Sequence, residues 1–371
     1  MNNMVAKRRT LSISVLVFFV AIITFPFYVF SSGGAQISSI FFLLLSMLAI
    51  DQTNKKFISN FNNVVFYYYF FILYAILIAI CWFLITLKFV FFGFIVFYIF
   101  NLFVLFGVVF FLTKNEVFYK IFPKIIAFSV VVQFILSLVV GNGESLRDSL
   151  FFNNPNQLGY YALISAAILV IFFKKKNISG YWFYPAILCT LWLAQLSLSN
   201  ATLISILLLF SYAVFSNLKT FLFAVFAIFL LSLIILDTQD LFSDRTDIIL
   251  DRFSTIGEGD DDSLAGRGYD RIWNHPFITL VGGGEGAVYR WKSFLSESEI
   301  HSSWGTLLFS YGLIGFSLFM LFLKNIVYSE RFITFVPFLV IGLYGITHNG
   351  LRFVYFWIFL AVCVALKLRK E

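Results

Sequence analysis

The stretch FVFFGFIVFYIFNLFVLFGVVFFL, residues 89–112, decides the fold class of this chain. It contains no charged side chain, and a helix of about 20 apolar residues is long enough to cross the roughly 30 Å hydrocarbon core of a membrane. The remaining sequence is similar: 61% of the 371 residues are hydrophobic, 52 are Phe and only 12% are charged. Soluble domains carry about 25% charged residues, so the sequence predicts an all-α polytopic membrane protein.

Apolar runs of comparable length predict about twelve transmembrane helices. Helices one to nine occupy residues 1–236, a long extracytoplasmic loop occupies 237–302, and helices ten to twelve occupy 303–371. The expected spans are 11–30, 36–50, 64–87, 89–112, 121–140, 157–173, 181–197, 201–216, 219–236, 303–323, 332–347 and 353–367.

The distribution of basic residues predicts the orientation. With the N-terminus in the cytoplasm and alternating spans, 17 of the 26 Lys and Arg residues face inward and nine face outward, six of them in the 237–302 loop. Cytoplasmic loops of membrane proteins are enriched in Lys and Arg. We therefore expect both termini in the cytoplasm. The net charge of +7 then reflects topology and contact with the lipid bilayer, and no motif indicates a nucleic acid partner.

Polar residues collect on the outer side, where the 237–302 loop holds 13 of the 19 acidic residues. Seven of the nine outer basic residues are Arg, whereas thirteen of the seventeen inner ones are Lys. Arg presents a planar fork that binds phosphate oxygens in pairs. This bias favours a phosphorylated ligand at the outer face, with drift in small counts as the alternative.

The stretch GRGYDRIWNHP, residues 266–276, predicts a helix over 264–274 that ends before Pro276. Arg267 and Arg271 are one helical turn apart and are expected on one face. Like charges at this spacing repel, and a shared anion such as pyrophosphate would offset the repulsion.

Two other interpretations of this region stay open. Asp270 or another acid of the loop would also neutralise the arginine pair. The glycine-rich LVGGGEG that follows, residues 280–286, would either bring backbone N–H groups close to an anion or serve only as a hinge.

His301 lies at the outer mouth of the tenth span and is the candidate proton acceptor. It would equally suit an interfacial polar position beside Trp304, and Glu297 and Glu299 are alternative bases. The other candidate substrate-binding residues are predicted on the same side: Arg147, Asn153, Asn154, Asn156, Arg290, His348 and Arg352. Asn-Pro-Asn is also good turn chemistry, so its asparagines have a structural alternative.

Three stretches in this order carry a resemblance: FFNNPNQLGYYAL (151–163), the segment from LAGRGYDRIWNHP to GGGEG (264–286), and HSSWGTLLFSYGLIG (301–315). Ten residues separate Arg271 from Gly282, and HS is followed by nine residues and then by Gly-x-x-Gly. Together they resemble the O-antigen ligase and polymerase superfamily over 151–315. One departure is Asn200, where members of that superfamily often carry a basic residue.

The resemblance implies a GT-C-like glycosyltransferase that needs no metal or cofactor, in the bacterial inner membrane. Within that superfamily the chain looks most like an O-antigen polymerase, which moves a growing glycan from undecaprenyl pyrophosphate onto a lipid-linked repeat unit at the periplasmic face. Arg267 and Arg271 would hold the leaving pyrophosphate, and His301 would deprotonate or orient the acceptor hydroxyl. A chain-length regulator protein is a further implied partner.

Two alternatives differ in their chemistry. An O-antigen ligase would transfer the same glycan to the lipid A–core, and the Asn-Pro-Asn-Gln-Leu-Gly stretch favours the polymerase over it. A twelve-span transporter fits the number of spans, but transporters usually carry ionisable residues inside their spans. Lys88 and Lys124 are the only candidates for ionisable residues inside the predicted spans, and both are close to span ends.

Overall fold

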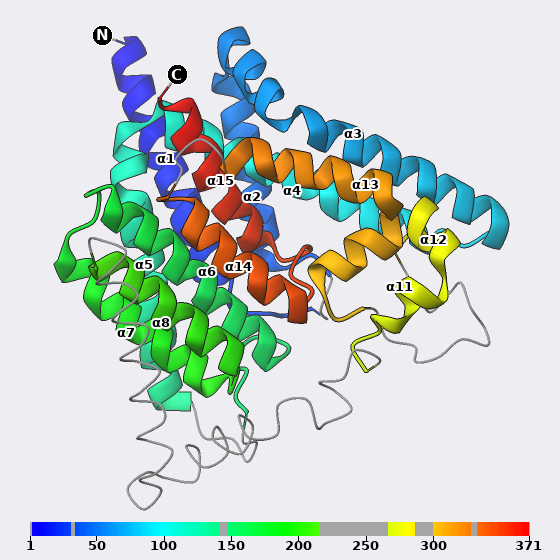
Figure 1. Cartoon of the computed structure of the whole chain (residues 1–371). Helices are drawn as coiled ribbons and strands as arrows, with labels where there is room; N and C mark the ends of the chain where they lie inside the picture. The colour runs from blue at the N-terminus through cyan, green and yellow to red at the C-terminus, as the bar shows by residue number, and fades with distance from the viewer. Residues whose placement is uncertain are drawn as a thin grey trace, which may run out of the picture. The chain divides into compact units, whose positions relative to one another are not determined.

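The computed structural model describes residues 2–30, 34–140, 147–215, 266–285, 300–327 and 332–370, and within these ranges it contains helices and no strand (Figure 1). The helices are α1 (Asn2–Thr24), α2 (Ile37–Gln52), α3 (Lys55–Thr86), α4 (Val90–Lys114), α5 (Glu116–Val140), α6 (Pro155–Lys174), α7 (Gly180–Leu196), α8 (Asn200–Val214), α11 (Asp270–Asn274), α12 (Pro276–Val281), α13 (Ser303–Val327), α14 (Phe335–Thr347) and α15 (Val354–Leu368).

Five of these helices, α3, α4, α5, α6 and α13, are long and apolar enough to cross a membrane. This agrees with the helical membrane protein expected from composition. Eleven of the twelve predicted spans fall on described helices, and the ninth, 219–236, lies outside the described residues. The total of twelve therefore stays a prediction, as does most of the 237–302 loop.

The helix that contains the predicted third span begins nine residues before residue 64. Helix α3 begins at Lys55, and the Asn54 side chain caps it by accepting a hydrogen bond from the Phe57 amide at 2.9 Å. A cap of this kind satisfies an amide that the helix itself leaves without a partner. The polar residues before the apolar run are therefore the first two turns of the helix and not a loop.

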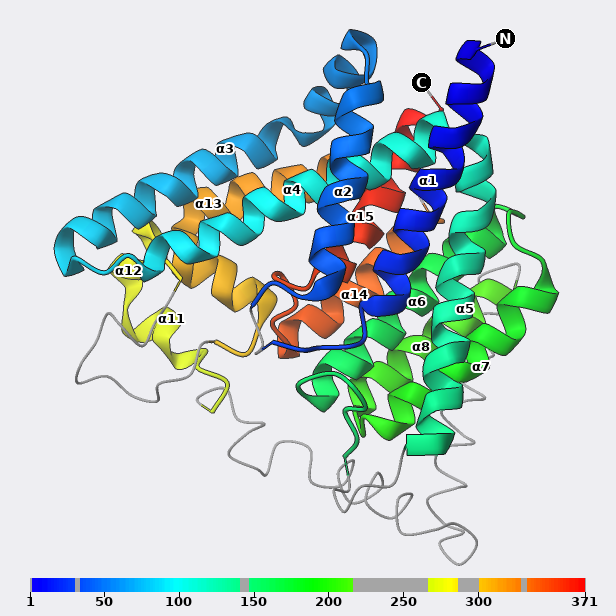
Figure 2. The same ribbon diagram turned by 180° about the vertical axis from the view of Figure 1, so that it is seen from behind.

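The described residues belong to two compact units, and each has its own core. Unit 1 comprises Met1–Phe41, Val117–Gly259 and Phe332–Tyr344, and helix α6 is buried along nearly its whole length. Small side chains at Ala162, Ala166 and Ala167 allow neighbouring helices to approach α6 closely. Helices α1 and α5 lie side by side through stacking of Phe18 on Phe122, with ring centroids 4.9 Å apart (Figure 2).

Unit 2 comprises Phe42–Glu116, Asp260–Arg331 and Gly345–Glu371. Its core is an aromatic cluster around Tyr68 of α3, which is fully buried. The Tyr68 ring lies 4.8 Å from Phe322 of α13 and 5.0 Å from Trp357 of α15. Its hydroxyl donates to the Tyr98 carbonyl of α4 at 3.0 Å, so one side chain joins four helices.

Helix α13 bends at Gly312, whose backbone has φ 64° and ψ −175°. The turn after α12 packs into this bend, and the Gly283 and Gly284 amides donate to the Phe309 and Ser310 carbonyls at 2.9 and 2.6 Å. A Cβ at Gly282 would lie 2.8 Å from the Tyr311 carbonyl carbon. We call the contact of residues 282–284 with α13 the glycine seam.

Helices α3 and α4 close the other side of the glycine seam (Figure 1). Tyr74 donates its hydroxyl to the Val281 carbonyl at 2.7 Å, and the Trp82 indole N–H donates to the Gly282 carbonyl at 3.1 Å. The glycine-rich stretch is therefore neither a bare hinge nor an anion cradle at these positions, because the helices around it take up its backbone groups.

The glycine seam predicts a strong effect of Gly312→Ala. The new methyl group would meet backbone atoms of Leu280 and Val281 on a residue with positive φ. We expect the free energy of unfolding to fall by about 2–4 kcal/mol, from left-handed strain and overpacking together. Thermal denaturation in detergent measures the loss.

Gly93→Ala of α4 is the matched control, because a Cβ there meets nothing within 4 Å. Alanine also favours the helix, so this variant should be as stable as the parent chain or slightly more stable. Equal melting temperatures for the Gly312 and Gly93 variants would contradict the account of the glycine seam.

Candidate functional site

Three chain segments of unit 2 meet at the end of α13 where that helix begins: residues 266–271, 300–306 and 345–352. The His301 amide donates to the Arg267 carbonyl at 3.0 Å, which joins the first segment to the second. Both the amide and the hydroxyl of Ser303 donate to the His348 carbonyl, at 3.1 and 3.0 Å, which joins the second to the third. These three segments carry five of the predicted site residues: Arg267, Arg271, His301, His348 and Arg352.

Hydroxyl side chains reinforce the junction of the three segments. Tyr269 donates to the Ser302 hydroxyl at 2.7 Å and also hydrogen-bonds to the Ile346 carbonyl. Ser302 in turn donates to the Gly345 carbonyl at 3.1 Å. Asn349 donates from its side-chain amide to the Thr306 hydroxyl at 3.1 Å. Several separate side-chain hydrogen bonds therefore hold the three segments of the junction together.

The prediction of one continuous helix over 264–274 is wrong for residues 266–269, while 264–265 lie outside the described residues. Residues 266–269 form a turn, and α11 begins only at Asp270, because Gly268 adopts φ +75° and cannot continue a right-handed helix. Its end at Asn274 is as predicted, and Pro276 then becomes the first residue of α12. Arg267 and Arg271 therefore do not share a helix face.

Arg267 contributes to the junction itself. Its Nη1 atom donates to the Thr347 carbonyl at 2.5 Å, which fixes the guanidinium against the end of α14. The remaining guanidinium nitrogens are further donors of the same planar group. The sequence left two roles open for Arg267, a ligand contact or an ion pair with an acid of the loop, and the structure adds this contact with a backbone carbonyl.

Arg271 is buried, with 6% of its surface exposed, although it lies on the five-residue helix α11. Burial lowers the pKa of its guanidinium, and the adjacent Asp270 carboxylate opposes that change. An arginine in a protein nevertheless keeps its charge at neutral pH. A buried cation is poorly screened by water, so its attraction for a negative ligand is stronger than at the surface.

The two histidines of the junction differ in their surroundings. His301 is exposed. His348 is half-buried, and its Nδ1 atom lies 2.9 Å from the Thr347 hydroxyl. The Arg267 contact and the His348 contact therefore meet at the same residue, Thr347.

Glu285 is a residue that the sequence analysis missed. It follows the glycine seam, is 5% exposed, and accepts a hydrogen bond from the Tyr98 hydroxyl at 2.5 Å. Tyr311 of α13 lies against Tyr98, with ring centroids 5.8 Å apart. The Arg352 guanidinium itself stands 5.1 Å from the centre of the Phe94 ring. A buried carboxylate among membrane helices is expensive and usually functional.

The other four candidates with described surroundings belong to unit 1 and form a second cluster. Arg147 donates from Nε to the Ser197 carbonyl at 3.2 Å and from Nη2 to the Asn156 side-chain oxygen at 2.9 Å. Ser197 ends α7, and Asn156 lies in the first turn of α6. Arg147 therefore ties the α7–α8 connection to the start of α6.

The asparagines around Pro155 have capping roles. Asn154 is the N-cap of α6, and its side chain accepts from the Gln157 amide at 2.9 Å. The Gln157 side chain accepts from the Asn153 amide at 3.1 Å, while Asn153 donates to the Phe30 carbonyl at 3.0 Å. This geometry favours the turn chemistry that the sequence left open beside sugar binding.

Residue 200, where the sequence departs from the resembled pattern, is the first residue of α8. Ser199 caps that helix by accepting from the Thr202 amide at 3.4 Å. Arg290, the remaining predicted substrate-binding residue, lies outside the described residues.

The chain matches no model of a known protein family, and no curated protein matches it. The chemistry of the junction in unit 2 and of the Arg147 cluster in unit 1 is therefore the basis for a proposed function.

Substitution of Asn154 distinguishes its two candidate roles, capping of α6 and binding of a sugar. Asn154→Ala should lower the free energy of unfolding by about 1 kcal/mol, because the Gln157 amide loses its acceptor. Asn154→Ser restores a capping oxygen and should restore the stability measured by thermal denaturation. If both variants match the parent chain in stability, the side chain has no capping role, and ligand binding remains as its candidate role.

Proposed function

We propose that this chain is an O-antigen polymerase, a glycosyltransferase that uses a polyprenyl pyrophosphate donor at the periplasmic face of the bacterial inner membrane. The observation that carries the proposal is the junction of three segments in unit 2. It gathers three arginines and two histidines at the start of an apolar helix, where the head of a lipid-linked substrate would be presented.

The charges suit a pyrophosphate leaving group. The acceptor hydroxyl attacks the anomeric carbon of the donor sugar, and the bond from that carbon to the pyrophosphate oxygen breaks. Negative charge then builds on the departing pyrophosphate. Arg271, which is charged and buried, would stabilise it, and Arg267 of the same junction would add a second contact.

The proton of the acceptor hydroxyl needs a base. His301 is exposed beside Arg267 and has an imidazole nitrogen that can accept the proton as the new glycosidic bond forms. His348, held by Thr347 on the opposite segment, would bind substrate oxygens rather than the transferred proton.

Substitution of Arg271 tests the proposal in cells. Arg271→Ala should lower turnover about 10²–10³-fold, the usual effect of losing one charge-stabilising contact in a transition state. A lipopolysaccharide gel should then show core carrying a single repeat unit instead of a ladder. Arg271→Lys should restore the ladder only in part, since an ammonium cannot make the paired contact.

Lys56→Ala is the control, because this exposed lysine in the first turn of α3 lies outside the junction. Bare core together with accumulated lipid-linked polymer would assign the chain to the O-antigen ligases instead. If Arg271→Ala, like the Lys56→Ala control, leaves the glycan ladder unchanged at normal protein levels, the proposal is contradicted.

The contact of Glu285 with Tyr98 favours a second candidate, a transporter, because ion pathways in transporters are built from such buried groups. Glu285→Gln distinguishes the two. The amide oxygen of Gln still accepts from Tyr98, so a polymerase should keep its glycan ladder. A transporter that moves protons or cations through this carboxylate should lose flux in proteoliposomes.

A further inference from the structure

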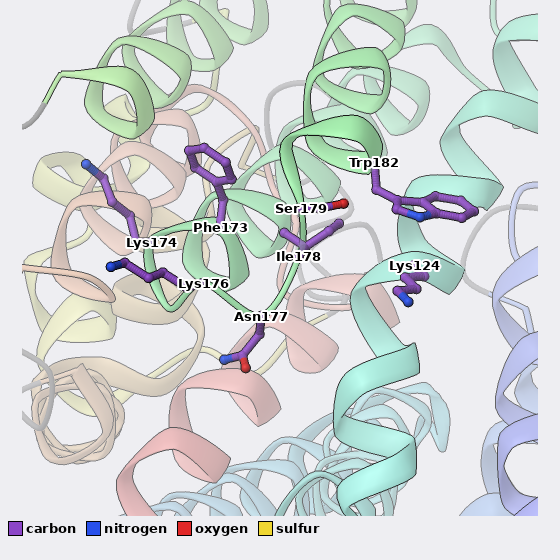
Figure 3. Close-up of a pocket in the computed structure, with 8 residues that line it drawn as sticks. All are labelled: Lys124, Phe173, Lys174, Lys176, Asn177, Ile178, Ser179 and Trp182. Atoms are coloured by element: carbon purple, nitrogen blue, oxygen red, sulfur yellow. The ribbon is translucent and has the colours of Figure 1, made fainter.

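Unit 1 contains a pocket of about 630 Å³ between α5 and the connection from α6 to α7 (Figure 3). Three lysines line it: Lys124 from α5, and Lys174 and Lys176 from the end of α6 and the residues after it. No acidic side chain is among the lining residues, whose other members are Phe173, Asn177, Ile178, Ser179 and Trp182. The pocket therefore has a strong preference for an anion.

The lysines stand on both sides of the connection between α6 and α7. Figure 3 shows Lys174 and Lys176 extending together on one side, and Lys124 beside Trp182 on the other. Lys124 and Lys176 are exposed, whereas Lys174 is half-buried, with its ammonium 4.8 Å from the centre of the Tyr212 ring. Each ammonium ends a flexible four-carbon stem, and together the three charges make both sides of the connection positive.

The frame of the pocket is fixed, although the lysines can move. The Asn177 side chain donates to the Tyr119 hydroxyl at 2.9 Å, which ties the connection to α5. Phe173 stacks on Phe183 with ring centroids 4.0 Å apart, and Ile178 is buried. These contacts give the pocket an apolar wall beside its charged rim.

In a second lysine-lined pocket, in unit 2, a lysine has a structural role. There Lys367 donates to the Asn325 carbonyl and to its side-chain oxygen at 2.8 and 2.7 Å. Asn325 in turn donates to the Val64 carbonyl at 2.9 Å. The charge is thus used to join helices. In the unit 1 pocket two of the three ammonium groups instead reach the surface.

The position of the unit 1 pocket points to lipid. Lys174 is the last residue of α6, a helix apolar enough to cross a membrane, so the pocket lies at the level where a span leaves the hydrocarbon. Indole rings such as that of Trp182 favour this interface. The excess of lysine predicts the cytoplasmic leaflet, whose phospholipids are partly anionic.

We propose that this pocket binds the phosphate group of an anionic glycerophospholipid, with the acyl chains along the apolar wall and the positive charge of Lys124, Lys174 and Lys176 attracting the phosphate. The shared chemistry is a phosphate anion, and the apolar wall favours the lipid over free phosphate as its source. The proposal is independent of the reaction proposed for unit 2.

Trp182 provides a direct probe of the pocket. The full-length chain is placed in nanodiscs that contain brominated phosphatidylglycerol or brominated phosphatidylcholine, since bromine quenches indole fluorescence on contact. The difference between the parent chain and Trp182→Phe isolates this residue from the other tryptophans. We expect the Trp182 signal to be quenched at a much lower fraction of phosphatidylglycerol than of phosphatidylcholine.

Lysine variants test the origin of that preference. Each lysine removed should reduce the preference for phosphatidylglycerol about fivefold, the effect of one basic group near an anionic surface. Lys124→Gln with Lys176→Gln changes only exposed side chains, so the fold should persist. Lys324→Gln, in the unit 2 pocket, is the matched control and should leave the quenching of Trp182 unchanged.

Two results would overturn the proposal. Equal quenching by the two lipids would show that the pocket does not select an anionic headgroup. Loss of the preference on addition of inorganic phosphate, at constant ionic strength, would assign the pocket to free phosphate instead of lipid.

Discussion

The glycine seam is the contact on which the rest of unit 2 depends. Backbone carbonyls within a membrane need a hydrogen-bond partner, and a bend in a helix removes some of them from the helix ladder. At Gly312 the Phe309 and Ser310 carbonyls instead accept from the Gly283 and Gly284 amides. This exchange holds α12 against α13, and with it α11, which carries Arg271.

Backbone and hydroxyl contacts join the three segments of the candidate site. The Tyr269 and Ser303 hydroxyls link residues 266–271, 300–306 and 345–352, and His301 is exposed. These hydrogen bonds hold the backbone that carries the candidate side chains.

Apolar length alone predicted where most helices lie, because a membrane span requires a continuous run of apolar residues. It failed where the helix signal is polar: Asn54 starts α3 well before the apolar run. The sequence also did not predict the turn at Gly268, whose positive φ separates Arg267 from the helix that carries Arg271. Helix propensity does not reveal such a conformation, because glycine adopts both signs of φ about equally.

The site was predictable in part. Order and spacing in the sequence associated Arg271 with His301, and the structure does bring their segments together. The contribution of residues 345–352 rested only on topology, since His348 and Arg352 lie at another outer end. Glu285 gave no signal, because its partner Tyr98 is 187 residues away and sits in an apolar run. Contacts over such separations depend on the packing of helices, which a single sequence does not record.

The glycine seam also bears on the order in which this chain is built. Helices α3 and α4 are synthesised before residues 276–285, but α13, whose carbonyls receive the glycine amides, is synthesised after them. During biogenesis the Gly283 and Gly284 amides therefore cannot reach their carbonyl partners until α13 has been synthesised. The glycine seam is then completed late in assembly, and a chain interrupted before α13 would lack it.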